Sequence, residues 1–265
     1  MPETPLVDPA WLADHRDDPS VHVVDVREPW EYDSIGHLPG AVNIPFDSYR
    51  DADSSDPGTL PGADAFAQLL GEAGIGPDDT IVAYDDTHGV FAARLLVTAL
   101  AYGHENVAVL DGDFSAWQRA FATTTESPAV ESVTYAIDGL AAAAPIVDRA
   151  AVAAAIDDET VTLLDTRDEA EYEEQHIPGA IRIDWREFVD DESRGVRSAA
   201  EIESLLTDRG ISTDRNQRII LYCNTSRRLS HTFVVLRSLG FTDVVIYEGS
   251  MTEWTAAGGT TESLV

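Results

Sequence analysis

The stretch Asp165-Thr166-Arg167-Asp168, followed by His176-Ile177-Pro178-Gly179-Ala180, decides the fold because the chain carries it twice. The earlier copy reads Asp25-Val26-Arg27-Glu28 and then His37-Leu38-Pro39-Gly40-Ala41. The two copies lie 140 residues apart at the aspartates and 139 apart at the glycines. Self-similarity over such a distance indicates that one structural unit is repeated.

Other blocks repeat in the same order along the chain. The matched blocks are 31–32 with 171–172, 81–85 with 219–223, and 112–117 with 249–254. The middle pair sets Asp85 in the first copy against Cys223 in the second, 138 residues later. The two copies therefore differ at a position where one of them has a thiol.

Two similar domains follow from the repeat. We predict one over residues 1–120 and one over 144–265, each close to the usual domain size. The segment between them, 121–143, is rich in Thr, Ser and Ala and contains Pro128, which predicts a linker. A short strand at 133–135 is predicted within it.

Short β-branched runs alternate with helical patterns in both copies. The predicted strands are 21–26, 81–84, 107–110, 161–164, 219–222 and 244–247. Strands separated by helices predict an α/β fold whose mostly parallel sheet is covered by helices on both faces. Asp8 followed by Pro9 predicts the start of a helix near the beginning of the first domain.

Cys223 is the only cysteine, so it cannot form an internal disulfide or a thiolate zinc site. It follows a predicted buried strand. After it, Leu229, Phe233 and Leu236 keep a helical spacing that ends at Gly240. Cys223 is thus predicted at the carboxyl end of a parallel strand, where open α/β sheets bind their ligands.

The segment Cys223-Asn224-Thr225-Ser226-Arg227-Arg228 suits a reactive thiolate. A short loop that turns into a helix points backbone N–H groups inward, and the helix start adds partial positive charge. These conditions favour the nucleophilic thiolate form. The alternative is a cysteine that serves as a small buried hydrophobe. The polar residues and arginines that follow Cys223 favour the nucleophile.

These motifs, with Gly249-Ser250 and Trp254 near the end, resemble those of tandem-domain rhodaneses over nearly the whole chain. The resemblance implies two rhodanese-like domains, the second catalytic and the first inactive with Asp85 in place of the cysteine. It implies that Cys223 takes sulfur from thiosulfate as a persulfide and passes it to cyanide or a thiol, without a cofactor or metal.

The resemblance also suggests which residues bind the anionic donor. Arg228 and Arg167 are the first candidates and Arg227 is a weaker third, while the loop residues 224–226 (Asn-Thr-Ser) surround the thiol. Arg167 has a structural alternative, an ion pair with Asp165 or with Asp168. Ser226 stands where the family commonly has glycine, so a left-handed backbone there costs more than usual.

Three histidines invite a Cys–His interpretation. His37 and His176 occur at matching places in both copies, including the copy without a thiol, so a role in the scaffold is favoured. His231 lies eight residues after Cys223 on the predicted helix and is likewise expected to be structural.

Other activities stay open as alternatives. Cysteine phosphatases and arsenate reductases use Cys-x5-Arg, whereas Arg228 gives Cys-x4-Arg, and the shorter loop favours sulfur over phosphate. Within the transferases, 3-mercaptopyruvate is the alternative donor, although Asn224, Thr225 and the arginine pair better suit a compact dianion. A noncatalytic sulfur-relay or redox-sensing role for Cys223 is the third hypothesis.

The chain is strongly acidic, with 48 acidic and 17 basic residues, a net charge of −31 and no lysine. This field disfavours nucleic acid and anionic membranes as partners. An acidic composition without lysine resembles proteins of salt-in halophiles. The sequence contains no long apolar run, and its acidic N-terminus is unlike a signal peptide, so a cytoplasmic location is expected.

Overall fold

The computed structural model describes residues 4–51 and 59–265. Residues 1–3 and 52–58, which fall within the predicted first domain, lie outside the described residues. Contacts divide the chain into two compact units. Of the described residues, unit 1 contains 4–51, 60–144 and 191–195, and unit 2 contains Thr59, 145–190 and 196–265. Among the described residues, no helix is long and apolar enough to cross a membrane.

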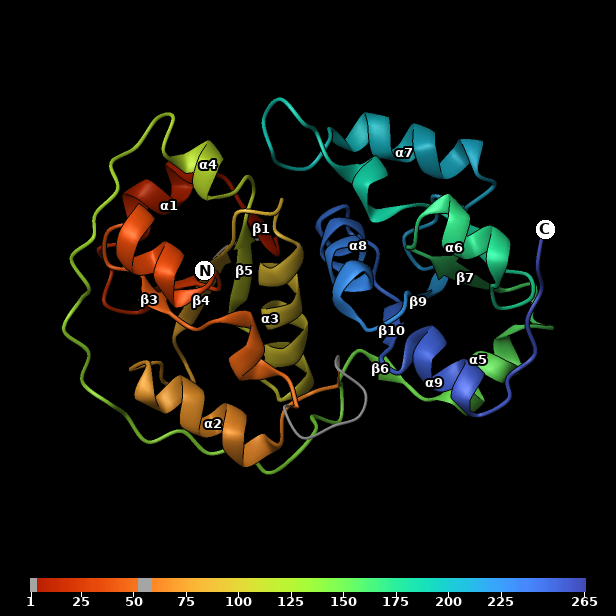
Figure 1. Cartoon of the computed structure of the whole chain (residues 1–265), viewed down its shortest axis with the longest axis horizontal. Helices are drawn as coiled ribbons and strands as arrows, with labels where there is room; N and C mark the ends of the chain where they lie inside the picture. The colour runs from red at the N-terminus through yellow and green to blue at the C-terminus, as the bar shows by residue number, and fades with distance from the viewer. Residues whose placement is uncertain (1–3, 52–58) are drawn as a thin grey trace. The chain divides into compact units, whose positions relative to one another are not determined.

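In the described residues, each unit contains one five-stranded sheet whose neighbouring strands are all parallel (Figure 1). The strands of unit 1, in sheet order, are β1 (Leu6–Val7), β5 (Val107–Leu110), β4 (Thr80–Tyr84), β2 (Val21–Asp25) and β3 (Val42–Asn43). Those of unit 2 are β6 (Ile146–Val147), β10 (Val244–Tyr247), β9 (Arg218–Tyr222), β7 (Val161–Asp165) and β8 (Ile181–Arg182). The two sheets share one topology, which confirms the predicted α/β repeat.

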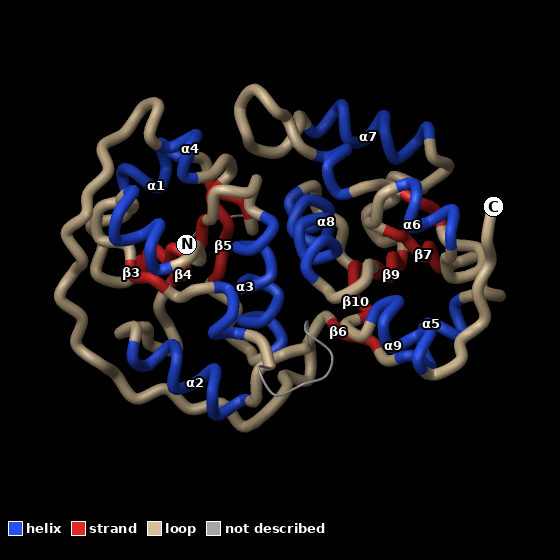
Figure 2. The backbone as a smooth tube through the Cα atoms, in the orientation of Figure 1, coloured by secondary structure: helices blue, strands red, loops and turns tan. Residues whose placement is uncertain are grey.

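Helices alternate with these strands along the chain (Figure 2). The α-helices of unit 1 are α1 (Pro9–His15), α2 (Ala63–Glu72), α3 (Val90–Ala101) and α4 (Phe114–Trp117). Those of unit 2 are α5 (Arg149–Ala155), α6 (Glu169–Glu174), α7 (Ala199–Asp208), α8 (Arg227–Ser238) and α9 (Ser250–Ala256). Glu31–Ile35 forms a π-helix, and Phe46–Tyr49 and Trp185–Phe188 form 3-10 helices.

The helices cover both faces of each sheet, as predicted. In unit 1, Val82 and Tyr84 of β4 join Leu12 of α1 and Trp117 of α4 in one buried cluster. Because side chains alternate along a strand, Ala83 points to the other face, which α3 covers. Unit 2 repeats this arrangement, with α5 and α9 on one face and α8 on the other.

The helix start predicted at Asp8 is confirmed. The backbone N–H of Trp11 donates to Asp8 Oδ1 at 2.8 Å, and Pro9 is the first residue of α1. The side chain of Asp8 thus satisfies a donor that the helix leaves open, and proline lacks the N–H that would need a partner.

The prediction of a strand at 133–135 is wrong. The segment is hydrogen-bonded to α2 and to a residue just after α3, and it is assigned to no strand. The N–H of Val133 donates to the Gly71 carbonyl in α2 at 2.9 Å. The Tyr135 hydroxyl lies 2.8 Å from Nδ1 of His104, just after α3. These contacts belong to unit 1, along which the segment runs in Figure 1.

Candidate active site

Cys223 lies directly after β9 and four residues before α8, as its place in the sequence predicts. It is only 1% exposed, which is deeper than its polar neighbours suggest. The start of α9 is hydrogen-bonded to its backbone. The N–H of Cys223 donates to Oγ of Ser250 at 3.2 Å, and its carbonyl accepts from the N–H of Met251 at 3.0 Å.

Ser226 adopts the left-handed conformation that its glycine-like position requires, with φ of 62°. Its hydroxyl donates to the Glu248 carbonyl, and its own carbonyl accepts from the Ser230 hydroxyl at 2.6 Å. The residue in the same place of unit 1, directly before α3, is Gly89, with φ of 80°. Both loops therefore turn at the residue before the helix, and in unit 2 serine stands there and adds a side-chain bond that glycine lacks.

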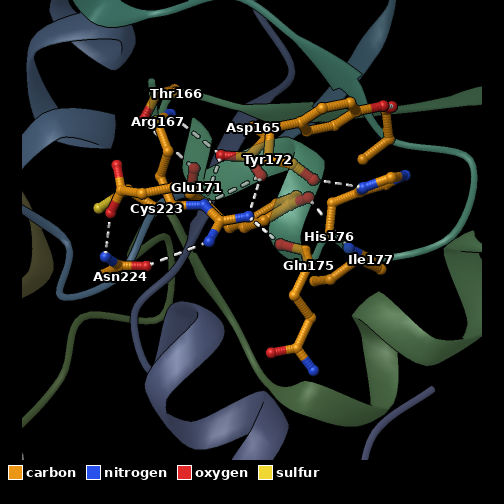
Figure 3. Close-up of polar contacts among 12 residues, drawn as sticks. Asp165, Thr166, Arg167, Glu171, Tyr172, Gln175, His176, Ile177, Cys223 and Asn224 are labelled. Atoms are coloured by element: carbon orange, nitrogen blue, oxygen red, sulfur yellow. Dashed lines mark hydrogen bonds and ion pairs between the residues drawn. The ribbon is translucent and has the colours of Figure 1, made fainter. Parts of the chain in front are cut away.

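Arg228 and Asn224 meet on one carboxylate, that of Glu171. Nη1 and Nη2 of Arg228 donate to the two oxygens of Glu171 at 2.5 and 2.9 Å. Nδ2 of Asn224 donates to Oε1 of Glu171 at 2.5 Å (Figure 3). Glu171 in α6 thus binds two candidate site residues of the cysteine loop.

The electrostatics of this cluster follow from the contacts. The hydrogen bond and charge of Arg228 lower the pKa of Glu171 to about 2, against the opposing effect of burial. Burial acts to lower the pKa of Arg228, but the bond to Glu171 and the electrostatic interactions with Cys223 and Glu171 outweigh it and raise that pKa. Arg228 is therefore a permanent cation within electrostatic reach of Cys223.

Arg167 is buried and bound on most sides. Its Nε lies 2.9 Å from Oδ1 of Asp165, and Nη2 lies 2.6 Å from Oδ2 of Asp165 and from the Gln175 carbonyl. Only Nη1 turns toward the cysteine loop, with a long bond of 3.4 Å to Oδ1 of Asn224 (Figure 3). Arg167 thus forms the ion pair with Asp165 that the sequence offered as its structural alternative.

Unit 1 repeats the buried pair. Nη2 of Arg27 lies 2.6 Å from Oδ2 of Asp25 and 2.7 Å from the Gly36 carbonyl. Because the same bonds form in the copy without a thiol, the pair stabilises the fold of both units. Its position beside the cysteine in unit 2 follows from the shared fold.

The remaining candidates differ in exposure. Thr225 is half-buried in the loop. Arg227, the first residue of α8, is exposed. The described contacts bring Asn224, Arg228 and Arg167 together.

The histidines occupy scaffold positions, as expected. His37 stacks on Tyr32 at 3.6 Å between ring centres, and His176 stacks on Tyr172 at 3.9 Å. Each binds the carbonyl of its stacked tyrosine through Nδ1. His231 is buried in α8 and packs edge-on against a tryptophan.

The matching loop of unit 1 holds an anion of its own. The Asp85 carboxylate accepts backbone N–H groups from Thr87, Gly89, Phe91 and Ala92, at 2.7, 2.8, 2.7 and 3.1 Å. Burial raises the pKa of Asp85, and these four donors act against the rise. The loop geometry of this fold can thus enclose a negatively charged group with amides.

Sequence reasoning missed two residues of the site, Glu171 and Ser250. The signal for Glu171 was the capping box that it forms with Asp168, where each side chain bonds the backbone of the other. That signal places Glu171 in the first turn of α6. It does not show the contact with Arg228, which lies 57 residues further along the chain.

Comparisons with known proteins agree with this geometry. The rhodanese-like domain family matches residues 8–120 and 148–257. A thiosulfate sulfurtransferase from Corynebacterium glutamicum is 33% identical, over 94% of this chain and 87% of that protein. A putative thiosulfate sulfurtransferase from Haloferax volcanii is 31% identical, over 94% and 92%.

A solved structure shows the same fold. The crystal structure of SseA from Escherichia coli, described as a 3-mercaptopyruvate sulfotransferase, superposes with a TM-score of 0.82. The match has 27% identity and covers 93% of this chain and 98% of that one. With two family matches that together span most of its length, the chain belongs to the rhodanese family.

Proposed function

We propose that this protein is a sulfurtransferase that takes the outer sulfur of thiosulfate onto Cys223 and passes it to cyanide or a thiol. The observation that carries the proposal is the setting of Cys223. The thiol ends β9, precedes the N-terminus of α8 and lies within electrostatic reach of Arg228. Relatives named thiosulfate sulfurtransferase align with nearly the whole chain.

The anion held in unit 1 supports a persulfide in unit 2. The helices α3 and α8 correspond at an offset of 137, so the amides of Gly89, Phe91 and Ala92 that bind Asp85 correspond to those of Ser226, Arg228 and Leu229. Gly89 and Ser226 are both left-handed residues directly before their helix, so the match holds at all three amides. N–H groups in these places would stabilise negative charge on the terminal sulfur of a persulfide.

The reaction then has two balanced steps. In the first, the Cys223 thiolate attacks the outer sulfur of thiosulfate, the S–S bond breaks, and sulfite leaves with the bonding electron pair. Cys223 keeps the sulfur as a persulfide anion. In the second, cyanide attacks the terminal sulfur, thiocyanate leaves, and the thiolate returns. Each step conserves charge and electrons, so the transfer needs no external oxidant or reductant.

Thiosulfate is the proposed donor because it is a compact dianion. Arg228 offers a planar pair of donors suited to bidentate binding of an oxyanion. Asn224 is a further donor at the same place. The alternative donor is 3-mercaptopyruvate, the compound in the description of the Escherichia coli structure.

The test is steady-state transfer to cyanide with each donor, in molar KCl. We expect turnover with thiosulfate, a mass gain of one sulfur atom on the wild-type protein, and loss of both in Cys223→Ser. Unfolding of Cys223→Ser should match that of the wild type, which separates lost chemistry from lost structure. Turnover in Cys223→Ser contradicts the persulfide, and a large preference for 3-mercaptopyruvate contradicts the donor.

A further inference from the structure

The carboxylate of Glu171 is already bound to Arg228, the cation that an anionic donor would need. Both terminal nitrogens of Arg228 bind it, and so does the side-chain amide of Asn224. The side chains of Glu171 and Arg228 are 27% and 17% exposed, so the pair is largely shielded from water. A carboxylate in this position is itself an occupant of the donor-binding groups.

The internal repeat separates two roles of this glutamate. In unit 2, Oε2 of Glu171 accepts the N–H of Asp168 at 3.3 Å, and in unit 1 Oε2 of Glu31 accepts the N–H of Glu28 at 3.2 Å. This bond to the backbone is common to both copies. It therefore serves the fold and does not depend on the thiol.

The second role exists only beside the cysteine. Asp86 follows Asp85 as Asn224 follows Cys223, and Phe91 is the second residue of α3 as Arg228 is of α8. Neither Asp86 nor Phe91 can donate a side-chain hydrogen bond to a carboxylate. The bonds from the loop to the glutamate are thus a feature of the copy that has Cys223. Because these bonds have no counterpart in the copy without a thiol, they indicate a role in the reaction at Cys223.

We propose that Glu171 is a specificity-determining residue that holds Arg228 and Asn224 until an anionic donor displaces it. The inference rests on the proposed function, whose donor is an anion. A donor that binds Arg228 through two oxygens must first take Nη1 and Nη2 from Glu171. The carboxylate then lies near the bound donor and repels it, more strongly for a dianion than for a monoanion.

The substitution Glu171→Gln isolates this effect. Glutamine also serves in a capping box, so the start of α6 keeps its bond to Asp168. It has no charge, so it holds Arg228 more weakly and does not repel the donor. We expect KM for thiosulfate to fall roughly fivefold, the size of an ion pair with limited exposure. We expect kcat to change little and KM for the monoanion 3-mercaptopyruvate to fall less.

Glu31→Gln is the matched control, because it removes the same charge at the same turn of the copy without a thiol. It should leave both KM values unchanged. A KM for thiosulfate that stays constant or rises in Glu171→Gln overturns the proposal, since it would mean that Glu171 only positions Arg228. Glu171→Ala repeats the test without a hydrogen-bonding side chain and should also lower KM.

A binding measurement separates this inference from the proposed function. Sulfate, a compact dianion that carries no transferable sulfur, should protect Cys223 from alkylation by iodoacetamide at constant ionic strength. Half-protection should need roughly fivefold less sulfate in Glu171→Gln than in the wild type or Glu31→Gln. If sulfur transfer fails but this shift occurs, the proposed donor is wrong and the role of Glu171 stands. If transfer succeeds without the shift, the role of Glu171 is wrong.

Discussion

At the scale of single residues, the arginines beside the cysteine divide into two kinds. Arg167 donates to Asp165 and to the Gln175 carbonyl, with one long bond to Asn224, and its side chain is 5% exposed. Arg228 binds a carboxylate that an incoming anion can replace. Burial without exchangeable partners indicates structure, whereas a cation held by a replaceable anion indicates binding.

This division predicts that removing either buried arginine, Arg167 or Arg27, destabilises the unit that contains it. Arg167→Met leaves the Asp165 carboxylate buried without its partner, which should cost about 3 kcal/mol in the free energy of unfolding. Arg27→Met should destabilise unit 1 by a similar amount, because Asp25 is bound in the same way. Denaturant unfolding measures both, with the exposed Arg186→Met as a control near zero.

Donor kinetics of the same variants test the functional alternative for Arg167. If the buried pair is structural, the folded fractions of Arg167→Met and Arg27→Met should have wild-type KM for thiosulfate. A KM that rises only in Arg167→Met would place that guanidinium on the donor and contradict the division drawn here.

At the scale of elements, the loop from β9 to α8 combines a strained backbone with a compensating bond. A non-glycine residue in the left-handed region costs about 1–2 kcal/mol. In return, the buried Ser226 hydroxyl binds the Glu248 carbonyl. The serine that stands in place of the usual glycine is thus hydrogen-bonded to the residue directly after the next strand, β10.

Two substitutions separate strain from bonding at this position. Ser226→Ala keeps the strain and loses the bond, so we expect a loss of about 1–2 kcal/mol in the free energy of unfolding. Ser226→Gly loses the bond but relieves the strain, so its stability should stay within about 1 kcal/mol of the wild type. Equilibrium denaturation of both variants makes the comparison. Equal destabilisation by alanine and glycine would show that strain contributes little.

The elements also show how far sequence patterns reach. The central strands β4 and β9 were predictable because each contains four consecutive apolar residues, 81–84 and 219–222, which are all buried. The edge strands β1, β3, β6 and β8 have two residues each, too few to show alternation. The site follows the same rule. Cys223 and Arg228 share a local motif, whereas the pairing of Glu171 with Arg228 joins residues 57 positions apart that only the fold brings together.

At the scale of the whole molecule, the net negative charge repels the proposed anionic donor, and the arginines at the site supply the local positive charge that it needs. A net charge of −31 repels small anions at low ionic strength. Arginine supplies every basic side chain, and its planar group binds carboxylates in pairs of bonds, as Arg228 does with Glu171. An anionic donor therefore depends on screening by salt to approach and on local cations to bind.

Self-repulsion on this scale predicts that salt stabilises the fold. From about 0.1 M to about 1 M KCl the Debye length shrinks from about 10 Å to about 3 Å, so repulsion between separated surface carboxylates largely disappears. The melting temperature should rise by roughly 2–4 °C for each kcal/mol of repulsion removed. Circular dichroism across the salt range measures the rise. Changing the exposed acids Asp17, Glu105, Asp157 and Glu159 to their amides should raise the melting temperature at low salt and flatten its salt dependence. A melting temperature that is constant or falls with KCl, or an equal slope in both proteins, would contradict charge repulsion as the cause.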